Sequence, residues 1–183
     1  MSGPIGDLVL DADVLMSLVA SGRVGEILSA CSYRGVVCER VERETLWIET
    51  DTPGSRVAVD FLSLEASGAI ARIAAAGAEV ASFLEFAREV DDGEAEAIAI
   101  ASHRRLTFAT DDRRATRAAV RLGIYVVDTP LLVTRWAAVS ADSVAAADAI
   151  ERIETRARYR PAASHPLAGE WAKLSKERPL LAS

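Results

Sequence analysis

The chain has 183 residues, half of them apolar, so it is long enough to bury the core of one domain. No apolar run reaches the roughly 18 residues that a membrane-spanning helix needs, and two histidines are too few for a zinc site of histidine and cysteine. The formal net charge of -6 argues against a nucleic-acid partner unless several acids cluster around cations.

The start of the chain lacks the basic and apolar stretches of a signal peptide, which predicts a cytoplasmic protein. Cys31 and Cys38 do not have CxxC spacing, so we expect both to stay reduced. Lysine is nearly absent, since Lys173 and Lys176 are the only two in the sequence.

The apolar run Leu8, Val9 and Leu10 predicts a short strand that is buried on both faces. Asp11 follows directly, at the carboxyl end of this strand, where open α/β sheets bind their ligands. Because burying an unpaired carboxylate is costly, we expect a cation opposite Asp11. Asp13 is a candidate N-cap of the next helix.

Four elements are predicted next: helices over residues 14–20 and 24–32, a strand over 35–38 and a helix over 39–49. On the last helix Val41, Thr45 and Ile48 share one face through their spacing. Glu44 lies within that face, where an acid needs a partner that a surface ion pair does not supply. We therefore expect a functional role for Glu44.

The middle of the chain is less informative: it predicts a loop over residues 51–55, a strand over 57–64, an alanine-rich helix over 66–76 and a helical turn over 83–88. A strong helix signal follows over residues 91–101. Asp91 and Glu94 fit a capping box at its start. That structural role does not account for Glu96, which lies past the first turn in a helix too apolar for the surface.

The remaining elements are a strand over 106–110, a helix over 113–122, a strand over 123–127, a helix from 129 to 136 or beyond, a helix over 143–158 and a helical turn near Trp171. The first of these strands ends in Asp111 and Asp112, which repeats the opening pattern. Strands that alternate with helices predict a parallel, three-layer α/β domain.

Four acidic positions stand out on independent grounds. Asp11 and the Asp111–Asp112 pair end strands, whereas Glu44 and Glu96 lie on inward helix faces. A small parallel sheet can bring all of them to one edge, where they raise one another's pKa unless cations are present. One or two Mg²⁺ or Mn²⁺ ions relieve this repulsion and activate water for attack on a phosphoryl group.

A row of arginines begins beside the last two acids and runs along one helix: Arg113, Arg114, Arg117 and Arg121. They are either solvated charge or phosphate contacts of a nucleic acid. No His, Lys or Cys is positioned as a nucleophile, so water is the expected attacking group.

Several segments resemble the PIN-domain nucleases in order and spacing: LVLDADVLMSL, the VxxE of residues 41–44, DDGEAEAIAIA, FATDDRRATRAA and GIYVVDTPLLVTRWA. The resemblance covers roughly residues 7–138 and is most specific to a bacterial subgroup with a GEAEAIALA helix. It implies a three-layer α/β/α domain with a central parallel sheet. It also implies metal-dependent hydrolysis of RNA, as in VapC-type toxins of toxin–antitoxin pairs.

The resemblance assigns the site residues. It makes Asp11, Glu44, Glu96 and Asp112 the catalytic acids, and it gives the metal to Asp11, Glu96 and Asp112, with Asp111 sharing or replacing the last. Asp13 stands where the family usually has Asn or Ser, which keeps an oxygen ligand and adds a charge.

The same resemblance sets the expected domain and partners. We expect a nuclease domain over residues 1–138 and a helical extension with a tail over 139–183. RNA is the expected substrate, and a small antitoxin and a second copy of the chain are the further candidate partners. No membrane association is expected.

Two alternatives stay open. One is a catalytically silent PIN-like binding module. The other is a HAD-type phosphohydrolase, because residues 11–15 also fit the DxDxV strand of that family. That family usually needs a lysine before Asp111, which this chain lacks, and it leaves Glu44 and Glu96 unexplained.

Overall fold

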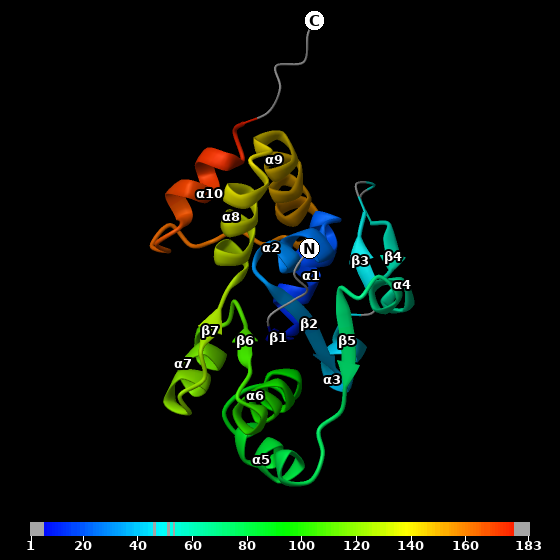
Figure 1. Ribbon diagram of the computed structural model, residues 1–183, viewed down its shortest axis with the longest axis vertical. Coiled ribbons are helices and arrows are strands. Elements are labelled where there is room, and N and C mark those ends of the chain that lie inside the picture. Colours follow the sequence, from blue (N-terminus) through cyan, green and yellow to red (C-terminus); the bar gives the residue numbers. More distant parts are fainter. Residues whose placement is uncertain (1–5, 46, 51, 53, 178–183) are drawn as a thin grey trace, which may run out of the picture.

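The computed structural model describes residues 6–45, 47–50, 52 and 54–177 (Figure 1). The strands are β1 (Gly6–Leu10), β2 (Tyr33–Cys38), β3 (Trp47–Glu49), β4 (Arg56–Ala58), β5 (Ile70–Ile73), β6 (Thr107–Ala109) and β7 (Val126–Val127). Five of them form a parallel sheet in the order β5-β2-β1-β6-β7, whereas β3 and β4 pair antiparallel in a separate sheet.

The helices connect these strands. They are α1 (Ala12–Ser21), α2 (Val24–Ala30), α3 (Glu39–Glu44), α4 (Phe61–Ala66), α5 (Ala78–Phe86), α6 (Asp92–Arg104), α7 (Arg113–Arg121), α8 (Thr129–Ser140), α9 (Ser143–Arg152), the π-helix η1 (Ile153–Ala157) and α10 (Ala168–Leu174). No helix in the described part of the chain is long and apolar enough to span a membrane.

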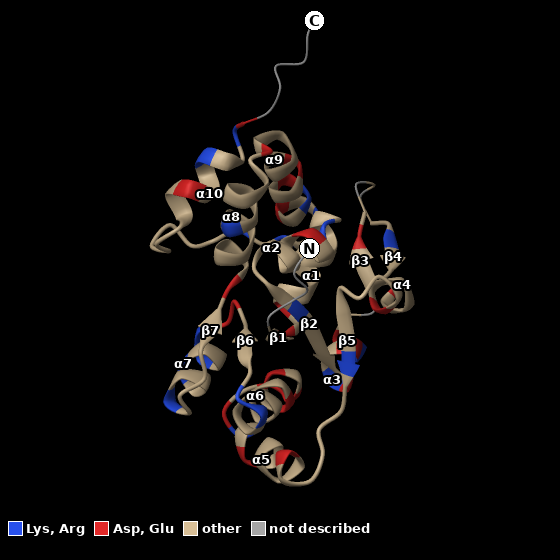
Figure 2. Ribbon diagram, in the orientation of Figure 1, with Lys and Arg blue, Asp and Glu red and all other residues tan. Residues whose placement is uncertain are grey.

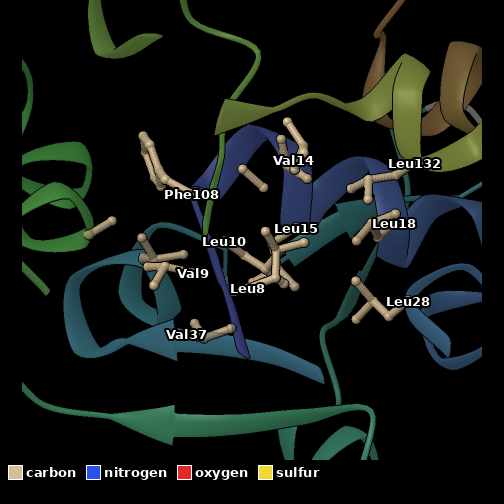
Figure 3. Packing of buried hydrophobic residues seen from close by; sticks show 14 of the residues in the cluster. Leu8, Val9, Leu10, Val14, Leu15, Leu18, Leu28, Val37, Phe108 and Leu132 are labelled. Atoms are coloured by element: carbon tan, nitrogen blue, oxygen red, sulfur yellow. The ribbon is translucent and has the colours of Figure 1, made fainter. Parts of the chain in front are cut away.

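β1 lies at the centre of the sheet because its three aliphatic residues need cover on both faces and both edges. Leu8, Val9 and Leu10 have no exposed surface, and Figure 3 shows them among the aliphatic side chains of the neighbouring strands and helices. Leu8 is aligned with Gly35 of β2 on one side and with Thr107 of β6 on the other. The predicted doubly buried strand is confirmed.

Helices cover both faces of the sheet (Figure 1). α6 packs on β1, β2 and β6, and α3, α5 and α7 pack against α6. On the other side α2 packs on β2, and α1, α8 and α9 complete that layer. The predicted three-layer α/β/α arrangement around a central parallel sheet is therefore confirmed.

The helix predicted over residues 39–49 is shorter than expected. α3 ends at Glu44, and the hydroxyl of Thr45 donates to the carbonyl of Val41 at 2.8 Å. Such local bonding by threonine competes with continued helix. Trp47–Glu49 instead forms β3, which pairs with β4.

The middle of the chain corrects two further predictions. The strand predicted over 57–64 is short, because β4 ends at Ala58 and the carboxylate of Asp60 caps α4 by accepting from Ser63 N at 2.9 Å. The helix predicted over 66–76 is wrong, because Ile70–Ile73 forms β5 against β2. Alanine's helix preference amounts to less than about 1 kcal/mol per residue, so pairing with a buried strand overrides it. Residues 51 and 53 of the predicted loop lie outside the described residues.

Residues 139–177, here called the C-terminal extension, pack on the rest of the described chain. α9 and η1 contact α1, and Trp171 of α10 is only 2% exposed. The indole Nε1 of Trp171 donates to Glu154 at 2.9 Å, and its ring meets Tyr159 edge to face. Cys31 and Cys38 are both buried and free, as expected.

Candidate active site

A pocket of about 340 Å³, here called the acid pocket, opens at the carboxyl end of β1. It is lined by Asp11, Ala12, Asp13, Met16, Glu44, Asp91 and Glu94. These residues come from three separate parts of the chain, and no Lys, Arg or His is among the described residues that line it. Acids therefore face one another here without a basic side chain between them.

Asp11 is held by the end of β1 and the start of α1. Asp11, and not the predicted Asp13, is the N-cap of α1, because its carboxylate accepts from Val14 N at 2.9 Å. Its own N–H donates to the carbonyl of Ala109 in β6 at 3.0 Å. Burial raises the pKa of Asp11 well above its usual range, and hydrogen bonds from Thr110 and Val14 lower it by less. The side chain is 3% exposed and has no ion-pair partner in the described part of the chain.

Glu44 reaches the acid pocket from the end of α3, where it is exposed and does not lie on the inward helix face that the spacing predicts. Its carboxylate lies against the backbone of Gly93 and accepts the Gly93 N–H. A Cβ added to Gly93 would lie 2.5 Å from Oε2 of Glu44, so only glycine leaves room for this approach. Burial, followed by the charges of Asp91 and Asp92, raises the pKa of Glu44.

Glu94 has two roles at the start of α6. Its backbone N–H donates to Asp91 at 2.9 Å, and its Oε2 accepts from Asp91 N at 3.3 Å, which confirms the predicted capping box. The same side chain lines the acid pocket. Burial, then Asp91 and Asp112, raise the pKa of Glu94 to about 7.

The sequence did not predict that Glu94 lines a pocket, because the capping box already explained an acid at this position. The available signal was Gly93, since a glycine in the first turn of an alanine-rich helix weakens the helix unless another group approaches closely.

Glu96 is buried, as expected, but lies elsewhere. Its Oε2 accepts from the backbone N–H of Arg40 at 3.2 Å and pairs with the Arg40 guanidinium at 3.4 Å. The thiol of Cys38 also bonds to it. The structure thus joins Glu96 to the β2–α3 junction and does not bring it into the lining of the acid pocket.

The carboxylates of Asp111 and Asp112 accept hydrogen bonds from different elements. Asp112 caps α7 by accepting from the N–H groups of Arg114 and Ala115, and its charge acts on Asp13 and Glu94 of the acid pocket. Asp111 instead accepts from the backbone N–H of Thr129 at 3.0 Å and from its hydroxyl at 2.6 Å. The charge of Asp111 acts on Asp11, so both acids influence the acid pocket, although neither is among its lining residues.

The arginines of α7 divide into two pairs, and Figure 2 shows basic residues along this helix. Arg114 donates to the carbonyl of Glu89 at 2.6 Å, and Arg121 forms an ion pair with the Glu89 side chain. Arg113 and Arg117 lie four residues apart, on a shared helix face, and have no hydrogen-bond or ionic partner among the described residues. Those two are free to contact a ligand.

The donor set of the acid pocket suits a hard divalent cation, because Mg²⁺ and Mn²⁺ prefer carboxylate oxygens. Within the described residues, however, no three or more candidate ligands already converge closely enough to hold an ion. The acid pocket therefore offers suitable ligand atoms, but its carboxylates would have to move closer together to hold a cation.

Comparison with known proteins identifies the family. A family model described as a PIN domain matches residues 7–163, whereas no curated protein and no solved structure gives a significant match. PIN domains are generally nucleases and typically use divalent metals. The matched region includes every acid described above and continues through α9 and η1. A match over most of its length makes this chain a member of the PIN-domain family.

Proposed function

We propose that this protein is a metal-dependent endoribonuclease that cleaves single-stranded RNA. The observation that carries this function is the acid pocket, which Asp11, Glu44 and Glu94 line from three parts of the chain at the carboxyl edge of a parallel sheet. Clustered carboxylates without a basic partner favour a bound cation. Membership of a family whose members are generally nucleases supports phosphodiester hydrolysis as the reaction.

Asp11, Glu44 and Glu94 would hold Mg²⁺ or Mn²⁺, with Asp13 and Asp112 close by. When bound, such an ion stabilises negative charge on phosphoryl oxygens and makes water more acidic. We assign to Glu94 the part that the sequence pattern gives to Glu96. The reason is that Glu94 lines the acid pocket, whereas Glu96 is engaged with Arg40.

The chain positions these acids through backbone contacts. Val14 N–H holds Asp11, Gly93 N–H holds Glu44, and the capping box holds Glu94, so the backbone sets the starting position of each carboxylate. No His, Lys or Cys is among the described lining residues, so water is the nucleophile. Water attacks phosphorus, the bond to the 3′ oxygen breaks, and the phosphate stays on the 5′ end of the downstream product.

The free arginines of α7 support RNA as the substrate. Arg113 and Arg117 would contact phosphates beside the acid pocket and offset the net charge of -6. We further propose a VapC-like role as the toxin of a toxin–antitoxin pair. An acidic segment of a small antitoxin would then cover the same arginines.

Two glutamine variants on one helix test the assignment. Glu94→Gln keeps an acceptor for the capping box and removes only the charge, so we expect a stable protein whose RNA cleavage falls at least about 100-fold. Glu96→Gln weakens the buried pair with Arg40, so we expect a lower melting temperature and cleavage within about tenfold of wild type. Asp11→Asn should behave like Glu94→Gln.

The measurements are cleavage of a single-stranded RNA with Mg²⁺ or Mn²⁺, end-group analysis of its products, and thermal unfolding. Loss of cleavage in Glu96→Gln but not in Glu94→Gln would return the third acid to Glu96. Cyclic phosphate ends, or activity that survives EDTA and Asp11→Ala, would refute metal-dependent hydrolysis by water. RNA binding without cleavage by the wild type would identify the silent binding module. The HAD-type alternative is set aside, because the chain belongs to the PIN-domain family.

A further inference from the structure

A second polar pocket, here called the tail pocket, lies beside the same edge of the sheet. Its volume is about 420 Å³, within the range of about 300–1,000 Å³ that is typical of small-ligand sites. Thr110, Asp111 and Arg113 of the β6–α7 region supply one wall. The C-terminal extension supplies the other wall through Tyr159, Arg160, Ala162, Ser164, His165 and Pro166. The tail pocket therefore exists only because the extension returns to the sheet.

The tail pocket and the acid pocket share a wall. Thr110 lines the tail pocket, and its hydroxyl donates to Asp11 of the acid pocket. Asp111 also lines the tail pocket, and its charge acts on Asp11 of the acid pocket. A ligand in the tail pocket would thus be a direct neighbour of a phosphate in the acid pocket.

The acids of the tail pocket already have internal donors. Asp111 accepts two hydrogen bonds from Thr129 and one from the Tyr159 hydroxyl. Asp128 accepts from Leu131 N and bonds to His165 Nε2, both at 2.9 Å. Because the Nδ1 of His165 accepts from Leu167 N, the proton of the neutral ring is on Nε2, which donates to Asp128. These bonds tie the C-terminal extension to the edge of the sheet and give both carboxylates hydrogen-bond donors from within the protein.

The ionic side chain of the tail pocket that lacks an internal partner among the described residues is a cation, Arg113. Arg113 is exposed and has no partner in the part of the chain that the structure describes, whereas Arg160 is paired with Glu154. Tyr159 and His165 add two rings to the lining. A guanidinium with aromatic side chains is the combination that proteins use for single-stranded nucleic acid, through phosphate contact and base stacking.

We infer that the tail pocket is a nucleotide subsite, which receives one nucleotide of the RNA that flanks the scissile phosphate, with Arg113 on its phosphate. This inference rests on the proposed nuclease function for the identity of the neighbouring pocket. It gives the C-terminal extension a part in substrate binding.

Two adjacent alanines provide a matched test. Ala162 lines the tail pocket, whereas Ala163 does not, and both are exposed on the same loop. Ala162→Trp should fill the pocket, and Ala163→Trp should leave it open with the same added bulk. Affinity for a fluorescein-labelled single-stranded octaribonucleotide, measured by anisotropy in EDTA, should fall roughly 5- to 150-fold in Ala162→Trp and stay near wild type in Ala163→Trp. Melting temperatures of both variants verify folding.

A second measurement removes the base instead of the pocket. Octaribonucleotides with one abasic position, scanned along the strand, should show one position whose loss weakens binding to wild type but not to Ala162→Trp. Equal affinities of the two tryptophan variants, or no such position, would overturn the subsite. Because binding is measured without metal, these results do not depend on cleavage. Cleavage that Asp11→Asn abolishes would still support the proposed function when the subsite fails.

Discussion

Gly93 is the residue on which the position of Glu44 depends. Gly93→Ala would place a methyl group 2.5 Å from Oε2 of Glu44, and the flexible end of that side chain must move away. Alanine is favoured over glycine in helices by up to about 1 kcal/mol, so we expect unchanged or higher stability. RNA cleavage should nevertheless fall by at least about tenfold, because the carboxylate loses its place. Thermal unfolding and a cleavage assay measure the two effects.

Gly169→Ala is the matched control, because Gly169 is also the second residue of its helix and an added Cβ there meets no atom within 4 Å. It should leave cleavage unchanged. Equal activity of the two variants would show that the contact between Gly93 and Glu44 has no part in the reaction.

Of the acids near the site, the sequence predicts the position of Asp11 but does not distinguish Glu94 from Glu96. The position of Asp11 was predictable, since an acid that directly follows a doubly buried parallel strand must lie at the carboxyl edge of the sheet. Glu94 and Glu96 were not separable, because they lie two residues apart on one helix and differ only in which neighbour meets them. Glu94 lines the acid pocket together with Asp11 and Glu44, whereas Glu96 pairs with Arg40, and both arrangements join segments far apart in the chain.

At the scale of elements, α7 carries one pair of arginines that contacts Glu89 and one pair without a partner among the described residues. Removing Arg113 and Arg117 together should weaken RNA binding across all sequences, because phosphate contacts carry no base specificity. Two lost contacts should also lower the slope of log affinity against log salt by about 1.4. Affinity for a single-stranded RNA, measured over a range of salt concentrations, gives both quantities.

The control removes the other pair. Arg114 and Arg121 are engaged with Glu89, so their replacement by alanine should change the salt slope less, although stability falls slightly. Identical slopes for the two double variants would mean that the whole helix is only a solvated face.

Elements were predictable where local pattern and tertiary context agree, as for the capped α6 and the apolar β1. They were not predictable where pairing decides. The alanine-rich segment forms β5 because it pairs with the open edge of β2. Trp47–Glu49 forms β3 because it pairs with β4. No periodicity within either segment carries that information.

At the scale of the whole molecule, the acids should set how stability depends on pH. Burial raises the pKa of Glu94 to about 7 and that of Asp111 to about 6, while Asp11 is also raised. A raised folded-state pKa means that the native state binds these protons more tightly than the unfolded chain does. The free energy of unfolding should therefore fall as the pH rises from about 5 to about 7.5. Denaturant unfolding at both values measures it.

Charge removal and metal provide the checks. Glu94→Gln should flatten this pH dependence, and Mg²⁺ or Mn²⁺ should raise stability more at about pH 7.5 than at about pH 5, since ligands bind as carboxylates. Glu79 has the opposite effect on the pH dependence, because its hydrogen bond with Arg104 lowers its pKa. The stability that Glu79 contributes is lost only below this pH range, when its carboxylate becomes protonated. Stability that rises from about pH 5 to about pH 7.5 in the metal-free protein would contradict the clustering of acids.

The order of strands in the sheet also has a consequence for synthesis. β1 finds β2 soon after it leaves the ribosome, but its other neighbour, β6, lies about 100 residues further along the chain. At translation rates of about 5–20 residues per second, one edge of the central strand stays bare for on the order of 5–20 s. During that interval the nascent chain holds Asp11 and Glu44 but gains Glu94 only just before β6 covers the exposed edge. The acid pocket is therefore completed at nearly the same stage of synthesis as the core of the sheet.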